Sequence, residues 1–477
     1  MKKKELSLGI ALLPIVILVL LLSYNVLVYG DDALGGSNQF ILLLGAAVAG
    51  IVGFYYKIGY QKMIDKVAEN LQSVTGALLI LLFVGALAGT WLISGIIPAM
   101  IYYGLQILHP SIFLPACIII CAIISLATGS SWTTSATVGI ALIGIGKVLG
   151  IPVGMVAGAV ISGAYFGDKL SPLSDTTNLA PAMAGGELFS HIKYMTLTTI
   201  PSIIITLVVF FILSLTQSTS GAADTETLML AIEEKFTITP WLFIVPGTVI
   251  LLIIKKSPPL IALLIGTLLG GLFAVVFQSK ILLEINESSI LSFEVAYRAI
   301  MNSITISTEI NTSNTLLNDL FTSGGMEGML GTIWLIICAM VFGGIMDAIG
   351  ALERVSNALL NWAQTTFQLF ASTVASCLAI NLTASDQYLA IVIPGKMFAK
   401  AYKDRKLAPE NLSRTLEDSG TVTSVLIPWN TCGAYQSGVL GVDVGDYFVY
   451  AIFNWLSPFM TLLFAAFNIK IKALKTT

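Results

Sequence analysis

Residues 167–181 read GDKLSPLSDTTNLAP and place carboxylates, hydroxyls, an amide and two prolines inside a strongly apolar chain. Prolines lack the backbone N–H, and the residue before a proline avoids the α-helical region, so a helix cannot run straight through this stretch. The carbonyl oxygens freed by such a break, together with hydroxyls, can replace the hydration shell of a small cation. The stretch therefore predicts a cation site made by Asp168, Ser171, Ser174, Asp175 and Asn178.

A second stretch, EDSGTVTSVLIPWN at residues 417–430, has the same mixture of acids, hydroxyls and a proline. Two shorter polar segments, TGSSWTT at 128–134 and TASDQ at 383–387, each join two apolar runs and are interpreted as hairpin tips. Glu417 is expected to face the cytoplasm. These three segments add the following residues to the predicted site: Thr128, Ser130, Ser131, Thr383, Ser385, Asp386, Asp418, Thr421, Ser424 and Asn430.

The composition is that of an integral membrane protein. The 477 residues are 56% hydrophobic and 11% charged, whereas soluble domains average about 25% charged. Apolar runs at 8–28, 40–56 and 203–215 approach the roughly 20 residues that cross a bilayer as a helix, and backbone groups in lipid must be paired internally. A β-barrel would instead show alternating polarity. We therefore predict an all-α polytopic membrane protein embedded in the lipid bilayer.

The charge distribution predicts the orientation of the chain. A net charge of −3 is too small to indicate a nucleic-acid partner. Lysine and arginine in short loops mark the cytoplasmic side. They occur at Lys2–Lys4, at 57–66, at 255–256, at 400–414 and at 470–475, whereas the loops at 217–239 and 278–330 are acidic. Both termini are therefore expected in the cytoplasm, with the chain crossing the plasma membrane several times.

The two halves of the chain share a weak internal repeat. A shift of 255 residues pairs Thr128 with Thr383, and a shift of 250 pairs Asp168 with Asp418. The predicted repeat cores are residues 73–216 and 331–470, in opposite orientations. Inverted repeats with broken helices are typical of secondary transporters whose site lies near the middle of the membrane. The runs beside each tip either span the membrane fully or form a re-entrant hairpin, and we favour the hairpin.

Some of these residues have plainer interpretations. In the plainer interpretation, the breaks lie at the membrane surface. There Asp168 pairs with a lysine, and Asp175 is the N-cap of the following helix. Glycines at 150, 154 and 158 repeat every four residues along one helix. That spacing predicts close contact with another helix.

At these residues the sequence resembles the NhaC family of Na+/H+ antiporters and their malate/lactate antiporter relatives, within the ion transporter superfamily. The motifs that carry the resemblance are ATGSSWTTSATVGIALIGIG, GAVISGAYFGDKLSPLSDTTNLAPAMAG, LTASDQYLAIVIPGKMF and SRTLEDSGTVTSVLIPWNTCGAY. The resemblance implies two inverted units, each a hairpin plus a discontinuous helix, and it allows a homodimer. It also implies a secondary antiporter that exchanges cytoplasmic Na+ for external H+.

We expect Na+ at Asp168, Asp386 and Asp418, with Asp168 and one of the other two binding either Na+ or a proton but not both. No cofactor beyond the transported ions is expected. The alternative is Na+-linked exchange of a small carboxylate, although the central motifs contain no arginine and only Lys169 and Lys396 lie nearby. A channel is a further alternative, but broken helices in opposed copies suit alternating access better. An enzyme is not expected, because the sequence has no GxSxG or HExxH motif.

Overall fold

The computed structural model describes residues 6–29, 33, 35–107, 109–216 and 225–474. Regular structure in these residues is helical except for one antiparallel pair of short strands, β1 (Thr308–Glu309) and β2 (Thr322–Ser323). Eight helices are long and apolar enough to cross a membrane, and a bent pair, Glu226–Lys235 with Pro240–Ile254, adds a ninth apolar segment. The predicted all-α polytopic fold is thus confirmed. Lys2–Lys4 and residues 217–224, used for the orientation, lie outside the described residues.

The first two helices, α1 (Leu8–Tyr29) and α2 (Ser37–Tyr55), pack against each other. They precede a first group of helices, which ends at residue 216. Its members are α3 (Tyr60–Ile93), α4 (Ile96–Ile107), α5 (Pro110–Thr128), α6 (Ser131–Thr134), the π-helix η2 (Ser135–Gly139), α7 (Ile140–Val148), α8 (Val153–Leu170), α9 (Asp175–Ala184) and α10 (Leu188–Thr216).

A connecting region follows, made of α11 (Thr225–Lys235), η4 (Pro240–Phe243), α12 (Ile244–Ile254), α13 (Pro259–Phe277), α14 (Ser279–Ile285), α15 (Phe293–Thr305), α16 (Thr315–Leu320) and η5 (Glu327–Met329). The second group then begins. Its members are α17 (Leu330–Ala348), α18 (Ala351–Trp362), α19 (Thr366–Thr383), α20 (Gln387–Asp404), α21 (Pro409–Leu416), the π-helix η6 (Glu417–Thr421), η7 (Ser424–Leu426), α22 (Thr431–Leu440), α23 (Val444–Tyr447) and α24 (Ile452–Ala466).

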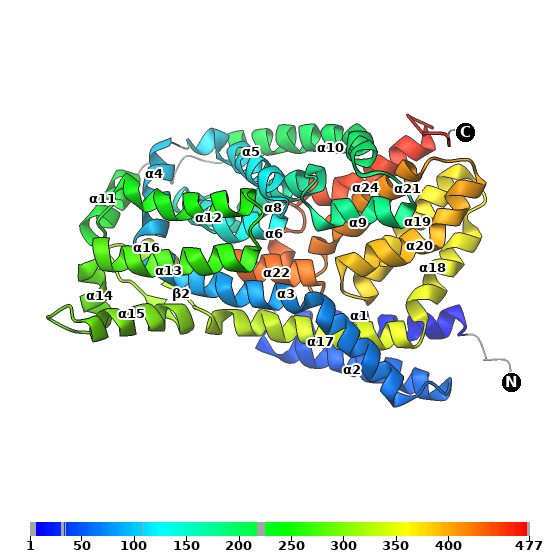
Figure 1. Cartoon of the computed structure of the whole chain (residues 1–477), viewed down its shortest axis with the longest axis horizontal. Coiled ribbons are helices and arrows are strands. Elements are labelled where there is room, and N and C mark those ends of the chain that lie inside the picture. The colour runs from blue at the N-terminus through cyan, green and yellow to red at the C-terminus, as the bar shows by residue number, and fades with distance from the viewer. Residues whose placement is uncertain (1–5, 30–32, 34, 108, 217–224, 475–477) are drawn as a thin grey trace.

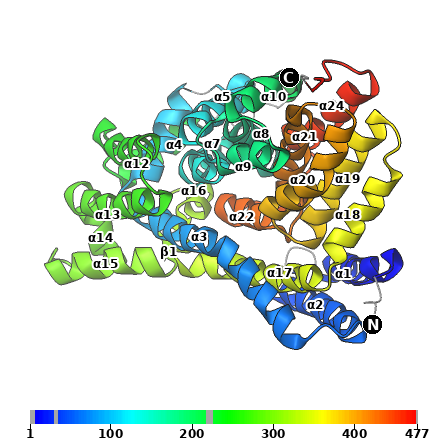
Figure 2. The ribbon, with the colours of Figure 1, turned by 45° about the vertical axis from the view of Figure 1, so that its right-hand side comes forward.

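The long helices α3, α13 and α17 run along the long axis of the molecule (Figure 1). Helices α18 to α21 gather at one end of this axis, and α11, α14 and α15 lie at the other end. In the turned view of Figure 2, α9 of the first group lies beside α20 and α21 of the second, in agreement with their contacts. The centre of the molecule is therefore built by both groups.

From α5 onward the two groups correspond at a single offset of 256 residues. Helix α5 begins at Pro110 and α19 begins at Thr366. Helices α9 and α22 are of equal length, and each is followed by a left-handed glycine, Gly185 and Gly441. Positions 153–170, which form α8, match 409–426, where the second group has α21, η6 and η7. The two groups thus share one order of elements. The limits of the predicted cores, 73–216 and 331–470, stay a prediction.

This offset differs from the shift of 250 that paired Asp168 with Asp418 in the sequence. At 256 residues, Asp168 corresponds to Ser424, and the N-cap Ser174 corresponds to the N-cap Asn430. The discrepancy has a physical reason, because capping and chain reversal can be performed by several residue types. Equivalent backbone positions therefore carry different residue types, and a comparison of residue types alone selects the wrong register.

Helices α3 and α17, the first member of each group, run in opposite directions. On α3 and α17, a Cβ on Gly344 would lie 2.7 Å from the Val67 Cα, whereas a Cβ on Gly85 would lie 2.2 Å from the carbonyl oxygen of Gly325, before α17 begins. The contact that lies later in α3, at Gly85, is made with the earlier residue of the α17 segment, Gly325. Antiparallel packing of equivalent helices is what an inverted repeat requires.

Helix α8, which carries Asp168, is held by close backbone contacts on its glycine face. A Cβ on Gly154 would lie 2.3 Å from the carbonyl oxygen of Asp446, and one on Gly158 would lie 2.5 Å from that of Tyr450. The close helix contact predicted from the glycine spacing is therefore present. It fixes α8 against the segment around α23.

The substitution Gly158→Ala should destabilise the protein, because its methyl group would overlap the backbone at Tyr450. Overpacking of this kind costs about 1–3 kcal/mol, so the melting temperature of the detergent-solubilised protein should fall. Gly50→Ala in α2 is the matched control, since no heavy atom among the described residues lies within 4 Å of its added Cβ. Equal melting temperatures for the two variants would contradict the packing described here.

Candidate functional site

Both predicted hairpin tips are short reversals between two helices. The first tip follows α5, where Gly129 has a φ of 71° and Ser130 caps α6 by accepting from the Thr133 N–H at 3.1 Å. The second tip follows α19, where Ser385 has a φ of 60° and Asp386 caps α20 by accepting from the Leu389 N–H at 2.9 Å. A positive φ is strained for serine, and such strain is often found at functional sites.

Both predicted helix breaks are also present. Ser171 and Ile427 are extended and each precedes a proline, as expected for residues in that position. The chain then re-enters a helix at Ser174, which caps α9, and at Asn430, which caps α22. The helix is therefore broken at the equivalent position of each group, and carbonyl and hydroxyl oxygens are left free of regular helix there.

Each tip is hydrogen-bonded to the broken helix of its own group. In the first group, Asp168 Oδ2 accepts from the Ser131 N–H at 3.0 Å and from the Ser131 hydroxyl at 2.7 Å. In the second group, the Thr431 N–H donates to the Ser385 carbonyl at 2.9 Å. Across the groups, the Trp132 ring stacks on Tyr435 with a centroid separation of 4.0 Å. These contacts bring all four polar segments together.

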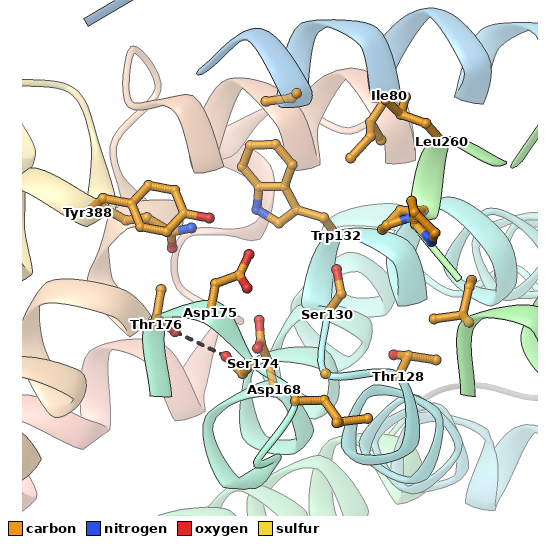
Figure 3. A pocket seen from close by; sticks show the side chains of 18 of the residues that line it. Ile80, Thr128, Ser130, Trp132, Asp168, Ser174, Asp175, Thr176, Leu260 and Tyr388 are labelled. Atoms are coloured by element: carbon orange, nitrogen blue, oxygen red, sulfur yellow. Dashed lines mark hydrogen bonds between the residues drawn. The ribbon is translucent and has the colours of Figure 1, made fainter. Parts of the chain in front are cut away.

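A cavity of about 600 Å³ lies between these segments (Figure 3). Its wall is completed by α3 and by the loop between α12 and α13, where Lys256 and Pro258 are exposed. Six residues of the predicted site line it: Thr128, Ser130, Asp168, Ser174, Asp175 and Asp386.

The three carboxylates of the cavity have different surroundings. Asp168 is half-buried and held by Ser131, whereas Asp175 is exposed to the cavity at the start of α9. Asp386 is 1% exposed, and its Oδ2 has no hydrogen-bond partner among the described residues. A buried carboxylate oxygen without a partner is costly. The residue lines the cavity, while this oxygen is enclosed by the surrounding protein.

Asp418 lies outside the cavity wall, in a separate buried cluster. It forms an ion pair with Lys169, and both side chains are fully buried. It also accepts hydrogen bonds from Thr198 at 2.8 Å and from Thr461. Asp418 therefore has an internal cation as its partner. Glu417, expected to face the cytoplasm, is instead fully buried, because the whole of the π-helix η6 lies in the protein interior.

The remaining predicted residues support the tips and breaks. Asn178 donates across the first break to the carbonyls of Pro172 and Ser174. Asn430 donates to the backbone of Asn381 in α19. Three others bond within their own segments: Ser171 accepts from Leu173, Thr383 donates to Ala379, and Ser424 donates to Thr421. The hydroxyls of Ser385 and Thr421 have no hydrogen-bond partner within the described part of the chain.

The cavity also contains residues that the sequence did not assign to the site, among them Trp132, Tyr388, Thr431 and Lys256. Trp132 lies within the first predicted tip and Tyr388 directly follows the second, so an aromatic residue beside a polar tip was an available signal. Lys256 belongs to a distant part of the chain, and nothing in its sequence context points to the cavity.

The substitution Lys169→Met should destabilise the protein, because it leaves Asp418 buried without an ion partner. Removing one member of a buried pair costs about 3–5 kcal/mol, which should lower the melting temperature in detergent. The double variant Lys169→Met with Asp418→Asn should recover part of the loss, since no unpaired charge remains. A Lys169→Met protein as stable as the wild type would show that the pair does not hold the two groups together.

Comparison with known proteins agrees with this geometry. A model of the Na+/H+ antiporter family matches residues 163–469. The chain is 36% identical over 430 residues to the Na+/H+ antiporter NhaC of Alkalihalophilus pseudofirmus, covering 90% of each chain. It is 35% identical to NhaC of Bacillus subtilis, covering 89% of this chain and 90% of that one. It is also 36% identical to the malate-2H+/Na+-lactate antiporter of Bacillus subtilis, covering 88% and 86% respectively. The chain therefore belongs to the Na+/H+ antiporter family.

Proposed function

We propose that this protein is a secondary active antiporter that exchanges cytoplasmic Na+ for external H+ across the plasma membrane. One observation carries the proposal: Asp168 and Asp386 line the same cavity, each supplied by a different group of helices. Similarity to NhaC Na+/H+ antiporters supports the exchange of these two ions. The exchange needs no cofactor beyond the transported ions.

Competition for the same oxygens accounts for the coupling. Na+ prefers hard oxygen ligands, and Asp168, Asp386 and the hydroxyls of Thr128 and Ser130 supply them in the cavity wall. A carboxylate that holds a proton has lost the charge that attracts Na+, so one ion leaves as the other binds. If unequal charges are exchanged, the membrane potential contributes about 2.3 kcal/mol per charge per 100 mV.

The position of Lys256 beside the cavity supports a state in which the cavity opens toward the cytoplasm. Lys256 lies at the exposed loop that completes the cavity wall, and lysine-bearing short loops face the cytoplasm. We therefore infer that Na+ enters the cavity from the cytoplasm, with both chain termini on the same side. A homodimer is proposed on the resemblance alone.

Na+-linked exchange of a small organic acid is the second candidate function. The cavity of about 600 Å³ is within the range of small-molecule sites. The hydroxyl-bearing residues Thr128 and Ser130 line the cavity and could donate to a carboxylate that Na+ also contacts. Similarity to a malate-2H+/Na+-lactate antiporter supports this candidate.

The substitution Asp168→Asn should abolish Na+-dependent proton movement in everted membrane vesicles, since an amide binds neither a proton nor Na+ in the required way. The movement is followed with a pH-sensitive dye after addition of Na+. Asp446→Asn is the matched control because Asp446 is exposed and does not line this cavity. Undiminished flux in Asp168→Asn would remove this residue from the ion site.

A further inference from the structure

The central cavity is larger than a single metal ion needs. Its volume of about 600 Å³ compares with pockets of about 300–1,000 Å³ that hold small molecules. Its three carboxylates come from separate elements, with Asp168 on α8, Asp175 on α9 and Asp386 on the second tip. A ligand that contacts more than one of them must therefore have some length.

The charge of the cavity wall is strongly acidic. Three aspartates line the cavity, and Lys256, on the exposed loop, is the one basic residue among the described residues that line it. Tyr388 lines the same cavity as Asp168, Asp175 and Asp386, so the three negative charges lie around one space. A cationic group in this region would be attracted by all three.

Helix N-termini at the tips and breaks could in principle favour an anion. In this molecule a first-turn amide of each helix already has a side-chain acceptor. The acceptors are Ser130 for the Thr133 N–H, Ser174 for Thr177, Asp386 for Leu389 and Asn430 for Cys432. The Ser131 N–H is taken by Asp168 as well. The cap positions at the tips and breaks therefore already hold side-chain oxygens, and at the second tip this oxygen is a carboxylate.

The aromatic side chains fit the same conclusion. The rings of Tyr388 and Trp132 lie on either side of Asp175 in Figure 3, and all three residues line the cavity. Aromatic faces attract ammonium and guanidinium groups, and this attraction adds to that of a carboxylate. Asp386 lines the same cavity as these two rings, so its negative charge adds to the attraction of a cationic group.

We propose that the cavity binds an organic cation, an alkylammonium or guanidinium group on a short carbon chain, held by Asp175 and Asp386 beside Tyr388, in competition with Na+. The inference rests on the proposed function only in that both ligands use this cavity. It concerns the class of organic ligand, and it differs from the organic-acid candidate in the sign of the charge.

Three ligands of equal length separate charge from size: putrescine, 1,4-butanediol and succinate. Each is added to purified wild-type protein in Na+-free potassium buffer, and the melting temperature is measured, since a ligand that binds the folded state raises it. Putrescine should raise the melting temperature, whereas butanediol and succinate should not. In vesicles, putrescine at high concentration should compete with Na+ for the cavity. The apparent KM for Na+ should therefore rise by about tenfold.

Matched variants locate the site. Asp175→Asn and Asp386→Asn should lose the putrescine-induced rise, whereas Asp446→Asn, the same change outside this cavity, should keep it. Stabilisation by succinate in place of putrescine, or by neither ligand, would overturn the inference while leaving Na+-dependent proton flux intact. Putrescine binding by a protein without that flux would uphold the inference and overturn the proposed function.

Discussion

The structure depends on how a carboxylate is kept inside an apolar helical protein. An isolated charge at the centre of a bilayer costs about 2.5–3.5 kcal/mol on insertion scales. Asp168 has no counter-ion within the described ranges and is held by two hydrogen bonds from Ser131 at a hairpin tip. Asp418, in contrast, is neutralised by Lys169 in a buried ion pair. The same chain thus holds one carboxylate that a cation can reach and one that already has its cation.

The two inverted groups are equivalent in backbone and different in charge. At the offset of 256 residues, Asp168 corresponds to Ser424, and Asp386 corresponds to Ser130. The first group therefore supplies Asp168 from its broken helix and Asp175 from α9, and the second supplies Asp386 from its hairpin tip. The cavity needs both groups, because neither contains the full set of acidic oxygens. This asymmetry explains why matching acidic residues between the halves did not reveal the true register.

Local physical rules made much of the fold predictable from the sequence. Apolar runs indicated the spans, the two prolines after Ser171 and Ile427 indicated the breaks, and small polar segments indicated the tips. The partner of Asp418 was not predictable, because Lys169 reaches it across 249 positions of sequence. The burial of Glu417 and the position of Lys256 at the cavity likewise depend on packing between distant helices. The residue assignments of the ion site remain predictions.

The central claim is that Na+ and protons compete for the carboxylates of one cavity. Calorimetric titration of Na+ into the purified protein, repeated in two buffers of different protonation enthalpy, measures the protons released for each Na+ bound. The account predicts proton release at a pH where the site is partly protonated, with weaker Na+ binding as the pH falls. Na+ binding that releases no protons and keeps the same affinity at every pH would contradict it.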